Sequence, residues 1–188
     1  MLSLQKILTE MKTLIIFVFL TILNSAVLAQ QAETIKWHTF EEAMRLNASA
    51  PRKILIDVYT DWCGYCKTMD AQTFGNPVIA RFINQNFYAI KFDAESTEPV
   101  DFAGHTFVNE GVRTGTRRPA HQLAAALGVS GYPTVVYFTA DLKMIGPVAG
   151  FYTPEKMEPL LHYIAEGRYQ SVSLKEFERT FVSRLSSR

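Results

Sequence analysis

The sequence predicts an α/β fold in which a central mixed β-sheet is flanked by helices on both faces. Two apolar runs, residues 54–59 and 87–93, have the length and the β-branched or aromatic content of strands. Residues 134–139 predict a third strand, and residues 144–150 predict its antiparallel neighbour. Pro147 restricts this neighbour to the edge of the sheet or to a bulge, because proline cannot donate to a strand ladder.

Two elements are expected before the central strand. Residues 34–37 predict a short first strand. Thr39 and Glu42 have the spacing of a capping box, in which the Thr hydroxyl and the Glu carboxylate satisfy the end donors of a helix reciprocally. That helix should end before Pro51, because a proline disfavours helical backbone in the residue that precedes it.

Two helical pieces are expected between the central strand and the strand at residues 87–93. The first follows Cys66 and should stop near Gly75. The second begins at Asn76-Pro77, where Asn offers a cap and Pro suits the first helical position. Its apolar residues recur at helical spacing and would form one inward face.

Three further helices are expected downstream. Residues 121–127 predict the first, which Gly128 closes at its C-cap. Thr153 starts the second. Residues 173–185 predict an amphipathic helix within a C-terminal extension of about residues 168–188. We expect this last helix to pack on the domain, and an exposed face for a partner is the alternative.

The N-terminus has the pattern of a secretory signal peptide over residues 1–29. An apolar stretch at residues 14–23 follows a basic residue, and residues 27–29 fit a cleavage site. Met11 is an alternative start. An uncleaved membrane anchor is the competing interpretation, but the apolar core is shorter than the roughly 20 residues that a helix needs to span a bilayer. We therefore expect export, cleavage and one mature domain at residues 30–188.

Composition and charge narrow the range of functions that the chain can have. A chain of 188 residues that is 48% hydrophobic can bury one substantial core. Its net charge of +1 gives no electrostatic argument for nucleic acid or for a membrane surface. The two cysteines are Cys63 and Cys66, so an exported chain of this kind has no further disulfide framework. The pair is therefore expected to be functional rather than structural.

Cys63 and Cys66 lie where the central strand gives way to a helix. The two residues between them let both sulfurs meet across the first helical turn, where unpaired backbone N–H groups and the helix dipole favour a thiolate. Lys67 adds positive charge. We expect Cys63 to be partly exposed and to attack a substrate disulfide, and Cys66, one turn deeper, to resolve the mixed disulfide.

Two other interpretations of the cysteine pair are an inert disulfide and half of a zinc site. So short a loop constrains the unfolded chain little, which speaks against a purely structural disulfide. The four histidines lack the spacing of zinc ligands.

Two separated stretches resemble one family. Residues 54–67, Ile-Leu-Ile-Asp-Val-Tyr-Thr-Asp-Trp-Cys-Gly-Tyr-Cys-Lys, resemble the active-site strand and loop of thioredoxins, including an acidic residue six positions before the first cysteine. Residues 128–138 resemble the family's cis-proline segment and the strand after it. Features within residues 73–95 are similar to a secreted subgroup of thioredoxin-like proteins. The resemblance implies a thioredoxin fold and thiol–disulfide chemistry.

The resemblance assigns a role in proton exchange to Asp57. A buried carboxylate has its pKa raised by desolvation, which would suit exchange with the thiol of Cys66. By the same resemblance, Lys91 would lie beside Asp57 and modulate it. An aspartate on the polar side of a half-exposed strand and an outward lysine are the alternatives.

The resemblance also implies a surface next to the dithiol that binds substrate. Pro133 should be cis and should place the backbone of Tyr132 beside Cys63, where an extended substrate segment pairs in a strand-like manner. A glycine at Gly150 would let the substrate approach. Ordinary turn, core or strand-end roles are the alternatives. The residues assigned to this surface are Trp62, Gly64, Tyr65, Tyr132, Pro133 and Gly150.

Residues 94–120 depart from the minimal thioredoxin pattern, and we interpret them as an insertion. The segment is polar and punctuated by glycine, and residues 102–111 hint at a hairpin. Its acidic residues come first in the chain, and Arg113, Arg117 and Arg118 follow them; the acidic residues are Glu95, Glu98, Asp101 and Glu110. A solvated loop and a docking surface for a partner are both compatible with this composition.

We therefore expect a thiol–disulfide oxidoreductase that reduces disulfides of exported proteins, periplasmic or secreted, without cofactor or metal. Tyr65 departs from Cys-Gly-Pro-Cys and leaves the redox direction open, so a disulfide oxidase or isomerase is the first alternative. A redox-silent module that binds a peptide or partner is the second. A membrane thiol electron donor or acceptor is the expected redox partner, nucleic acid is not expected, and a monomer is favoured.

Overall fold

The residues described by the computed structural model are 11–12, 33–113, 115 and 119–185. The chain separates into two units, Met1–Ala32 and Glu33–Arg188. In the first unit only residues 11–12 are described, and both are helical; the rest of the predicted signal peptide lies outside the described residues. Within the part of the chain that is described, no helix is both long enough and apolar enough to span a membrane.

The second unit alternates strands and helices. In chain order its elements are β1 (Trp37–His38), α2 (Phe40–Ser49), β2 (Lys53–Tyr59), α3 (Gly64–Met69), a π-helix (Asp70–Phe74), α4 (Pro77–Asn86), β3 (Phe87–Asp93), β4 (Val100–Phe102), β5 (His105–Phe107), α5 (Glu110–Arg113), α6 (Gln122–Ala126), β6 (Thr134–Phe138), β7 (Met144–Ala149), α7 (Pro154–Ala165), a 3-10 turn (Arg168–Gln170) and α8 (Leu174–Thr180).

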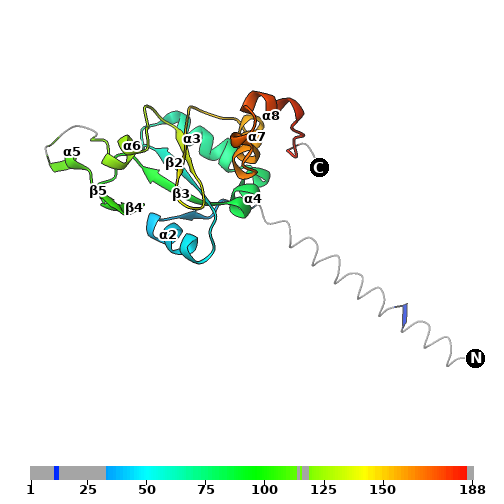
Figure 1. Cartoon of the computed structure of the whole chain (residues 1–188), viewed down its shortest axis with the longest axis horizontal. Helices are drawn as coiled ribbons and strands as arrows, with labels where there is room; N and C mark the ends of the chain where they lie inside the picture. Colours follow the sequence, from blue (N-terminus) through cyan, green and yellow to red (C-terminus); the bar gives the residue numbers. More distant parts are fainter. Residues whose placement is uncertain (1–10, 13–32, 114, 116–118, 186–188) are drawn as a thin grey trace, which may run out of the picture. The chain divides into compact units, whose positions relative to one another are not determined.

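Five strands form one mixed sheet in the order β1-β3-β2-β6-β7. β1, β3 and β2 run parallel, whereas β6 is antiparallel to β2 and β7 is antiparallel to β6 (Figure 1). Pro147 lies opposite Val136 on β7, which is an edge strand. The outer side of an edge strand has no neighbouring strand, so a residue without a backbone N–H is tolerated there. The predicted mixed sheet is confirmed.

Alternate side chains of the strands divide the core into two layers. On one face, Leu55 and Tyr137 pack against the helical run from α3 to α4 and against α7. On the other face, Ile56 and Val136 pack against α2, α6 and the β4–β5 hairpin. Because both faces are covered, β2 and β3 are apolar along almost their whole length rather than alternating.

Helix ends follow the predicted caps. Thr39 and Glu42 form the capping box of α2, with both bonds at 3.1 Å. Oδ1 of Asn76 accepts the backbone N–H groups of Val78 and Ile79 at the start of α4. These bonds satisfy donors that have no partner within the helix.

The helix after the cysteines changes its winding before it ends. The pattern predicts a stop near Gly75, and this is confirmed, but α3 continues from Asp70 as a π-helix. The N–H of Gly75 donates to the carbonyl of Asp70 at 2.8 Å, which is the π spacing. A Cβ on Gly75 would lie 2.5 Å from the carbonyl oxygen of Ala71, so the closing position requires glycine.

The first strand is shorter than the pattern predicts. A strand is expected over residues 34–37, but β1 covers Trp37–His38. The side chain of Asn84 on α4 explains the difference. It donates to the carbonyl of Thr34 at 2.9 Å and accepts the N–H of Lys36 at 2.8 Å, so these backbone groups have a partner without a strand ladder.

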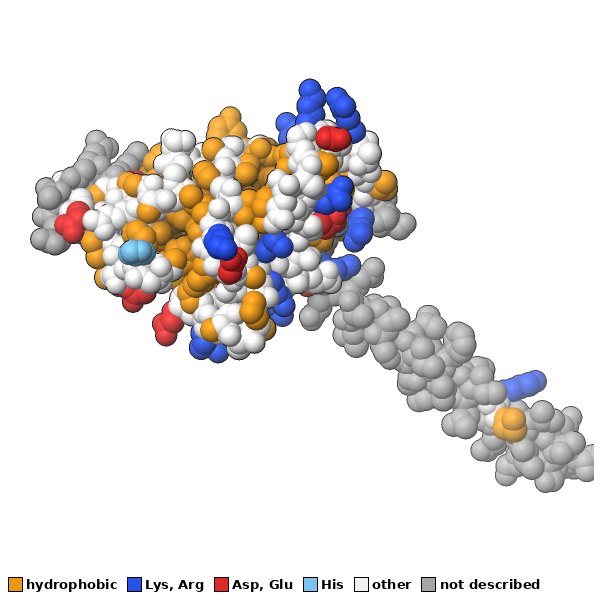
Figure 2. Space-filling view, viewed as in Figure 1, with side chains coloured by type: hydrophobic (Ala, Val, Ile, Leu, Met, Phe, Trp, Pro, Cys, Tyr) orange, Lys and Arg blue, Asp and Glu red, His pale blue; other side chains and the backbone are white. Residues whose placement is uncertain are grey.

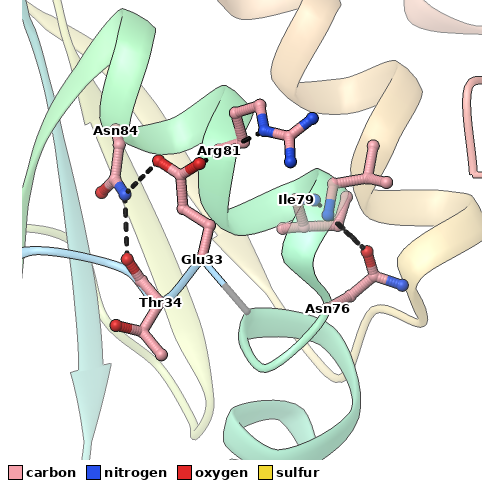
Figure 3. A network of polar contacts seen from close by, with 7 residues as sticks. Glu33, Thr34, Asn76, Ile79, Arg81 and Asn84 are labelled. Carbon is pink, nitrogen blue, oxygen red and sulfur yellow. Dashed lines mark hydrogen bonds and ion pairs between the residues drawn. The ribbon is translucent and has the colours of Figure 1, made fainter. Parts of the chain in front are cut away.

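The same network ties the start of the folded unit to α4. Figure 3 shows the carboxylate of Glu33 between Asn84 and Arg81, and both side chains donate to it at 3.2 Å. These two hydrogen bonds lower the pKa of Glu33. One helix thereby fixes the entry of the chain into β1.

The C-terminal helix is also shorter than predicted. The pattern predicts a helix over residues 173–185, whereas α8 covers Leu174–Thr180. After it, the Ser183 hydroxyl and the Arg184 N–H donate to the carboxylate of Glu158 on α7. Glu158 is 2% exposed, and a buried carboxylate requires such donors, so the chain leaves the helical path to supply them.

Residues 94–120 contain the predicted hairpin, formed by β4 and β5. Phe102 is buried, and its ring meets those of Phe40 and Phe138 edge to face, so the hairpin packs on the α2 side of the sheet. Of the basic residues in this segment, Arg117 and Arg118 lie outside the described residues.

Candidate redox site

Cys63 is the N-cap of α3, at the turn that follows β2. Its N–H donates to the carbonyl of Thr60 at 3.1 Å, and its Sγ accepts the N–H of Cys66 at 3.1 Å. The two sulfurs form a disulfide. After reduction, the same N–H would face a thiolate on Cys63, and hydrogen bonds to a charged acceptor are stronger than neutral ones.

Cys63 is less accessible than the sequence predicts. We expected a partly exposed sulfur, but Cys63 is 5% exposed and Cys66 is 3% exposed. The residues next to them occupy the surface instead: Trp62 is 50% exposed and Tyr65 is 70% exposed. A partner must therefore approach the disulfide across an aromatic surface.

Contacts among three loops form the rim of the site. The rings of Trp62 and Tyr132 meet edge to face with centroids 5.9 Å apart. The Tyr132–Pro133 peptide bond is cis, and the carbonyl of Pro133 accepts the N–H of Gly150 at 2.8 Å. The next residue, Phe151, has its ring 6.3 Å from that of Tyr65. The contacts thus run from one side of the cysteine loop to the other through two downstream loops.

Gly64 is the first residue of α3 and directly follows Cys63. A Cβ at this position would have no heavy atom within 4 Å. Its φ is not in the left-handed region, so neither crowding nor backbone strain demands glycine there. The absence of a side chain at Gly64 leaves the surface beside the disulfide uncovered at this position.

Asp57 and Lys91 lie opposite each other in the register of β2 and β3. The Nζ of Lys91 is 3.0 Å from Oδ2 of Asp57. Asp57 is 1% exposed, and its Oδ1 has no hydrogen-bond partner among the described residues. Both side chains project to the face that the α3 to α4 run covers, and this is why an aspartate in mid-strand is buried.

Burial controls the charge of this pair. Desolvation raises the pKa of Asp57 to about 6, and the nearby Lys91 only partly offsets it. Burial also opposes the charge on Lys91, but attraction to Asp57 and hydrogen bonds to Asp70 and Asp57 outweigh it and raise the pKa of Lys91. Asp57 is therefore poised to gain or lose a proton near neutral pH.

Sequence reasoning missed three residues that surround these groups. Asp70, the first residue of the π-helix, forms a second ion pair with Lys91. Glu95 accepts a hydrogen bond from the indole N–H of Trp62 at 2.9 Å. Phe151 completes the rim. None belongs to a local motif, and only the adjacency of Phe151 to Gly150 could have drawn attention to it.

Lys91 also contacts two aromatic rings. Its Nζ lies 5.0 Å from the ring centroids of Trp37 on β1 and Tyr59 on β2. Aromatic faces attract a cation at this distance. Two carboxylates and two rings therefore surround this one ammonium group. Within the described ranges, no group of three or more His, Cys, Asp or Glu is arranged to hold a metal ion.

A disulfide closed at the start of a helix, after a central strand that itself carries a buried carboxylate, defines a class of dithiol α/β domains. The chain belongs to the thioredoxin-like domain family, whose model matches residues 40–165. This match covers four of the five strands and the whole cysteine loop.

Curated relatives are longer proteins. The chain is 30% identical over 133 residues to an uncharacterized protein of Caenorhabditis elegans, covering 70% of this chain and 16% of the relative. It is 26% identical over 113 residues to the thiol:disulfide interchange protein DsbD of Pectobacterium atrosepticum, covering 59% of this chain and 16% of that protein. The chain thus spans about a sixth of the length of these relatives.

Solved structures show the same fold. The DsbH oxidoreductase superposes with a TM-score of 0.53 at 18% identity, covering 72% of this chain and 87% of that one. A putative disulphide-isomerase from Bacteroides thetaiotaomicron superposes with a TM-score of 0.50 at 24% identity, covering 70% and 94%. A thioredoxin-fold protein from Helicobacter pylori gives 0.51 at 17% identity, covering 80% and 89%.

Proposed function

We propose that the protein is a thiol–disulfide oxidoreductase that reduces disulfides of exported proteins through Cys63 and Cys66. The observation that carries the proposal is the disulfide itself, closed at a helix start where the Cys66 N–H points at the Cys63 sulfur. Membership of the thioredoxin-like family and the match to a thiol:disulfide interchange protein support the same chemistry.

The exchange has two steps. The Cys63 thiolate attacks one sulfur of the substrate disulfide, so that a mixed disulfide forms and one substrate thiolate leaves. Cys66, as a thiolate, then attacks the Cys63 sulfur and releases the second substrate thiolate. The substrate gains two electrons and, on protonation, two protons. The protein loses the same two electrons and returns to the Cys63–Cys66 disulfide.

Asp57 serves the second step in this proposal. Cys66 must lose its proton before it can attack, and a buried carboxylate whose pKa is about 6 can accept a proton at neutral pH. Lys91 holds that carboxylate by their ion pair and limits how far burial raises its pKa. Trp62, Gly64, Tyr65, Tyr132, Pro133 and Gly150 are proposed to form the surface that binds substrate.

Location and partners follow from the same proposal. The signal pattern at residues 1–29 would place the mature domain, residues 30–188, in the periplasm or outside the cell. Reduction there consumes the dithiol, so a membrane thiol donor is the proposed source of electrons. Within residues 30–188, residues 94–120 are the proposed insertion and residues 168–188 the C-terminal extension.

Two cysteine variants test the chemistry. Cys63→Ser should abolish reduction of a model disulfide, and Cys66→Ser should accumulate a covalent mixed disulfide that mass spectrometry detects. Turnover that survives in Cys63→Ser would refute the proposal. An unreactive pair that mild dithiol treatment does not open would favour a redox-silent binding module.

The reduction potential of the pair decides the direction. Equilibration with glutathione buffers should give a value near about −270 mV, as for thioredoxin, if the protein is a reductase. A value nearer about −120 mV would instead indicate an oxidase that donates its disulfide. The same titration therefore separates the proposal from its main alternative.

A further inference from the structure

A cleft of about 600 Å³ lies between α7, α8 and the loop after β7. Its apolar lining includes Phe151 from the loop, Pro159 from α7, and Leu174 and Phe181 from α8 and its end. α7 and α8 lie side by side at the end of the domain opposite the β4–β5 hairpin (Figure 1). The cleft is therefore separate from the region proposed as an insertion.

The cleft is continuous with the rim of the redox site. Phe151 lines the cleft and also contacts the ring of Tyr65, which lies between the two cysteines. The residue before it, Gly150, is hydrogen-bonded to Pro133. A substrate segment that crosses the rim at Gly150 would therefore reach the mouth of the cleft at Phe151.

We propose that this cleft binds an apolar side chain from the polypeptide that flanks the substrate's disulfide. The inference rests on the proposed thiol–disulfide exchange and adds a determinant of substrate choice to it. An extended segment that pairs along the rim carries alternate side chains to one side, and the cleft offers a pocket to one of them. Substrates that bury such a side chain will be preferred.

Charged side chains of both signs lie at the mouth of the cleft. Glu155 and Glu178 lie beside Lys156 at the cleft. Figure 2 shows acidic side chains interspersed with basic ones at this end of the domain. The apolar walls, rather than a net field, are therefore the feature that can discriminate among substrates.

Contacts with α7 hold in place the side of the cleft that α8 forms. The ring of Phe177 lies 5.7 Å from that of Tyr163 on α7, on the part of α8 that does not line the cleft. Beyond the helix, Glu158 binds Ser183 and Arg184. Phe181, between these two attachments, contacts His162 of α7 as well.

Single-turnover exchange with matched peptides tests the inference. Two peptides carry the same disulfide and differ in having Leu or Ser at the positions that flank one cysteine. Prereduced protein is mixed with each peptide, and the second-order rate constant is measured. Oxidised glutathione, whose cysteines are flanked only by γ-glutamyl and glycine groups without an apolar side chain, reports the intrinsic reactivity of the dithiol.

We expect the wild type to favour the Leu peptide about tenfold, as burial of one apolar side chain allows. Phe181→Ala, which removes a wall, and Glu178→Trp, which fills the mouth, should each reduce the preference to about twofold or less. Neither should change the rate with oxidised glutathione. Lys175→Ala, at an exposed position of α8 that does not line the cleft, is the matched control and should keep the preference.

Each other result overturns the inference. Equal rates for the two peptides in the wild type, or a preference that survives in both Phe181→Ala and Glu178→Trp, would show that the cleft does not select substrates. Loss of preference in Lys175→Ala would assign the effect to α8 as a whole rather than to the cleft. If the wild type exchanges with neither peptide nor oxidised glutathione, the proposed function itself fails, and the cleft inference fails with it.

Discussion

The indole N–H of Trp62 donates to the carboxylate of Glu95 across 2.9 Å. Trp62 precedes the first cysteine, whereas Glu95 follows β3 at the start of residues 94–120. The bond therefore joins the rim of the redox site to the segment that the sequence marks as an insertion. It also restricts Trp62, the half-exposed rim residue directly before Cys63.

Glu95→Ala should slow exchange with a peptide disulfide about fivefold, because Trp62 loses the acceptor that orients it. Glu95→Gln keeps an acceptor oxygen and should stay within about twofold of the wild type. The measurement is the second-order rate constant of the prereduced protein. Equal rates for Glu95→Ala and the wild type would contradict a positioning role.

The pKa of Asp57 predicts how stability changes with pH. Burial raises it from 3.8 to about 6, so the folded state holds this proton more tightly than the unfolded chain does. Its contribution to stability is fully present below pH 3.8 and is lost as the pH rises through about 6. At pH 7.5 the ionised, buried carboxylate should cost about 3 kcal/mol.

Asp57→Asn should therefore unfold at higher urea concentration than the wild type at a pH of about 7.5, and the difference should shrink or vanish at a pH of about 4. Asp101→Asn, on the exposed hairpin strand, is the control and should show no such trend. A stability difference between Asp57→Asn and the wild type that is independent of pH would be incompatible with a raised pKa.

Lys91 sets how far the pKa of Asp57 rises. Lys91→Met removes the cation 3.0 Å from the carboxylate, so the pKa of Asp57 should rise by a further unit or so. The pH at which the exchange rate reaches half its maximum should move upward with it. Lys91→Arg retains the charge and serves as the matched control. An unchanged pH profile in Lys91→Met would show that the pair does not govern the reaction.

Glu158 should govern attachment of the C-terminal segment. Glu158→Ala removes the acceptor for the Ser183 hydroxyl and the Arg184 N–H, so free energy of unfolding should fall by about 1–3 kcal/mol. Amide hydrogen exchange at residues 183–185 should accelerate more than exchange in β2. The exposed neighbour change Glu155→Ala is the control. Uniform acceleration across the domain would argue against a local attachment.

Local patterns were sufficient for much of the fold. The apolar runs gave β2 and β3, and Thr39 and Asn76 gave helix starts that the structure contains. The predicted boundaries are wrong where a side chain distant in sequence forms hydrogen bonds with the backbone. Asn84 shortens the first strand, and Glu158 ends the helical path of the C-terminus. Neither partner is near in sequence, so no local pattern could reveal it.

The sequence by itself determined the cysteine pair, its place between strand and helix, and the succession of strands along the chain, because these depend on residue type and short-range spacing. Only the tertiary structure decided that Asp57 is buried, because alternation along one strand cannot tell whether helices cover its second face. The contacts of Glu95 and Phe151 likewise required two distant segments to fold against the cysteine loop, and the ion pair of Asp70 required β3 to bring Lys91 beside it.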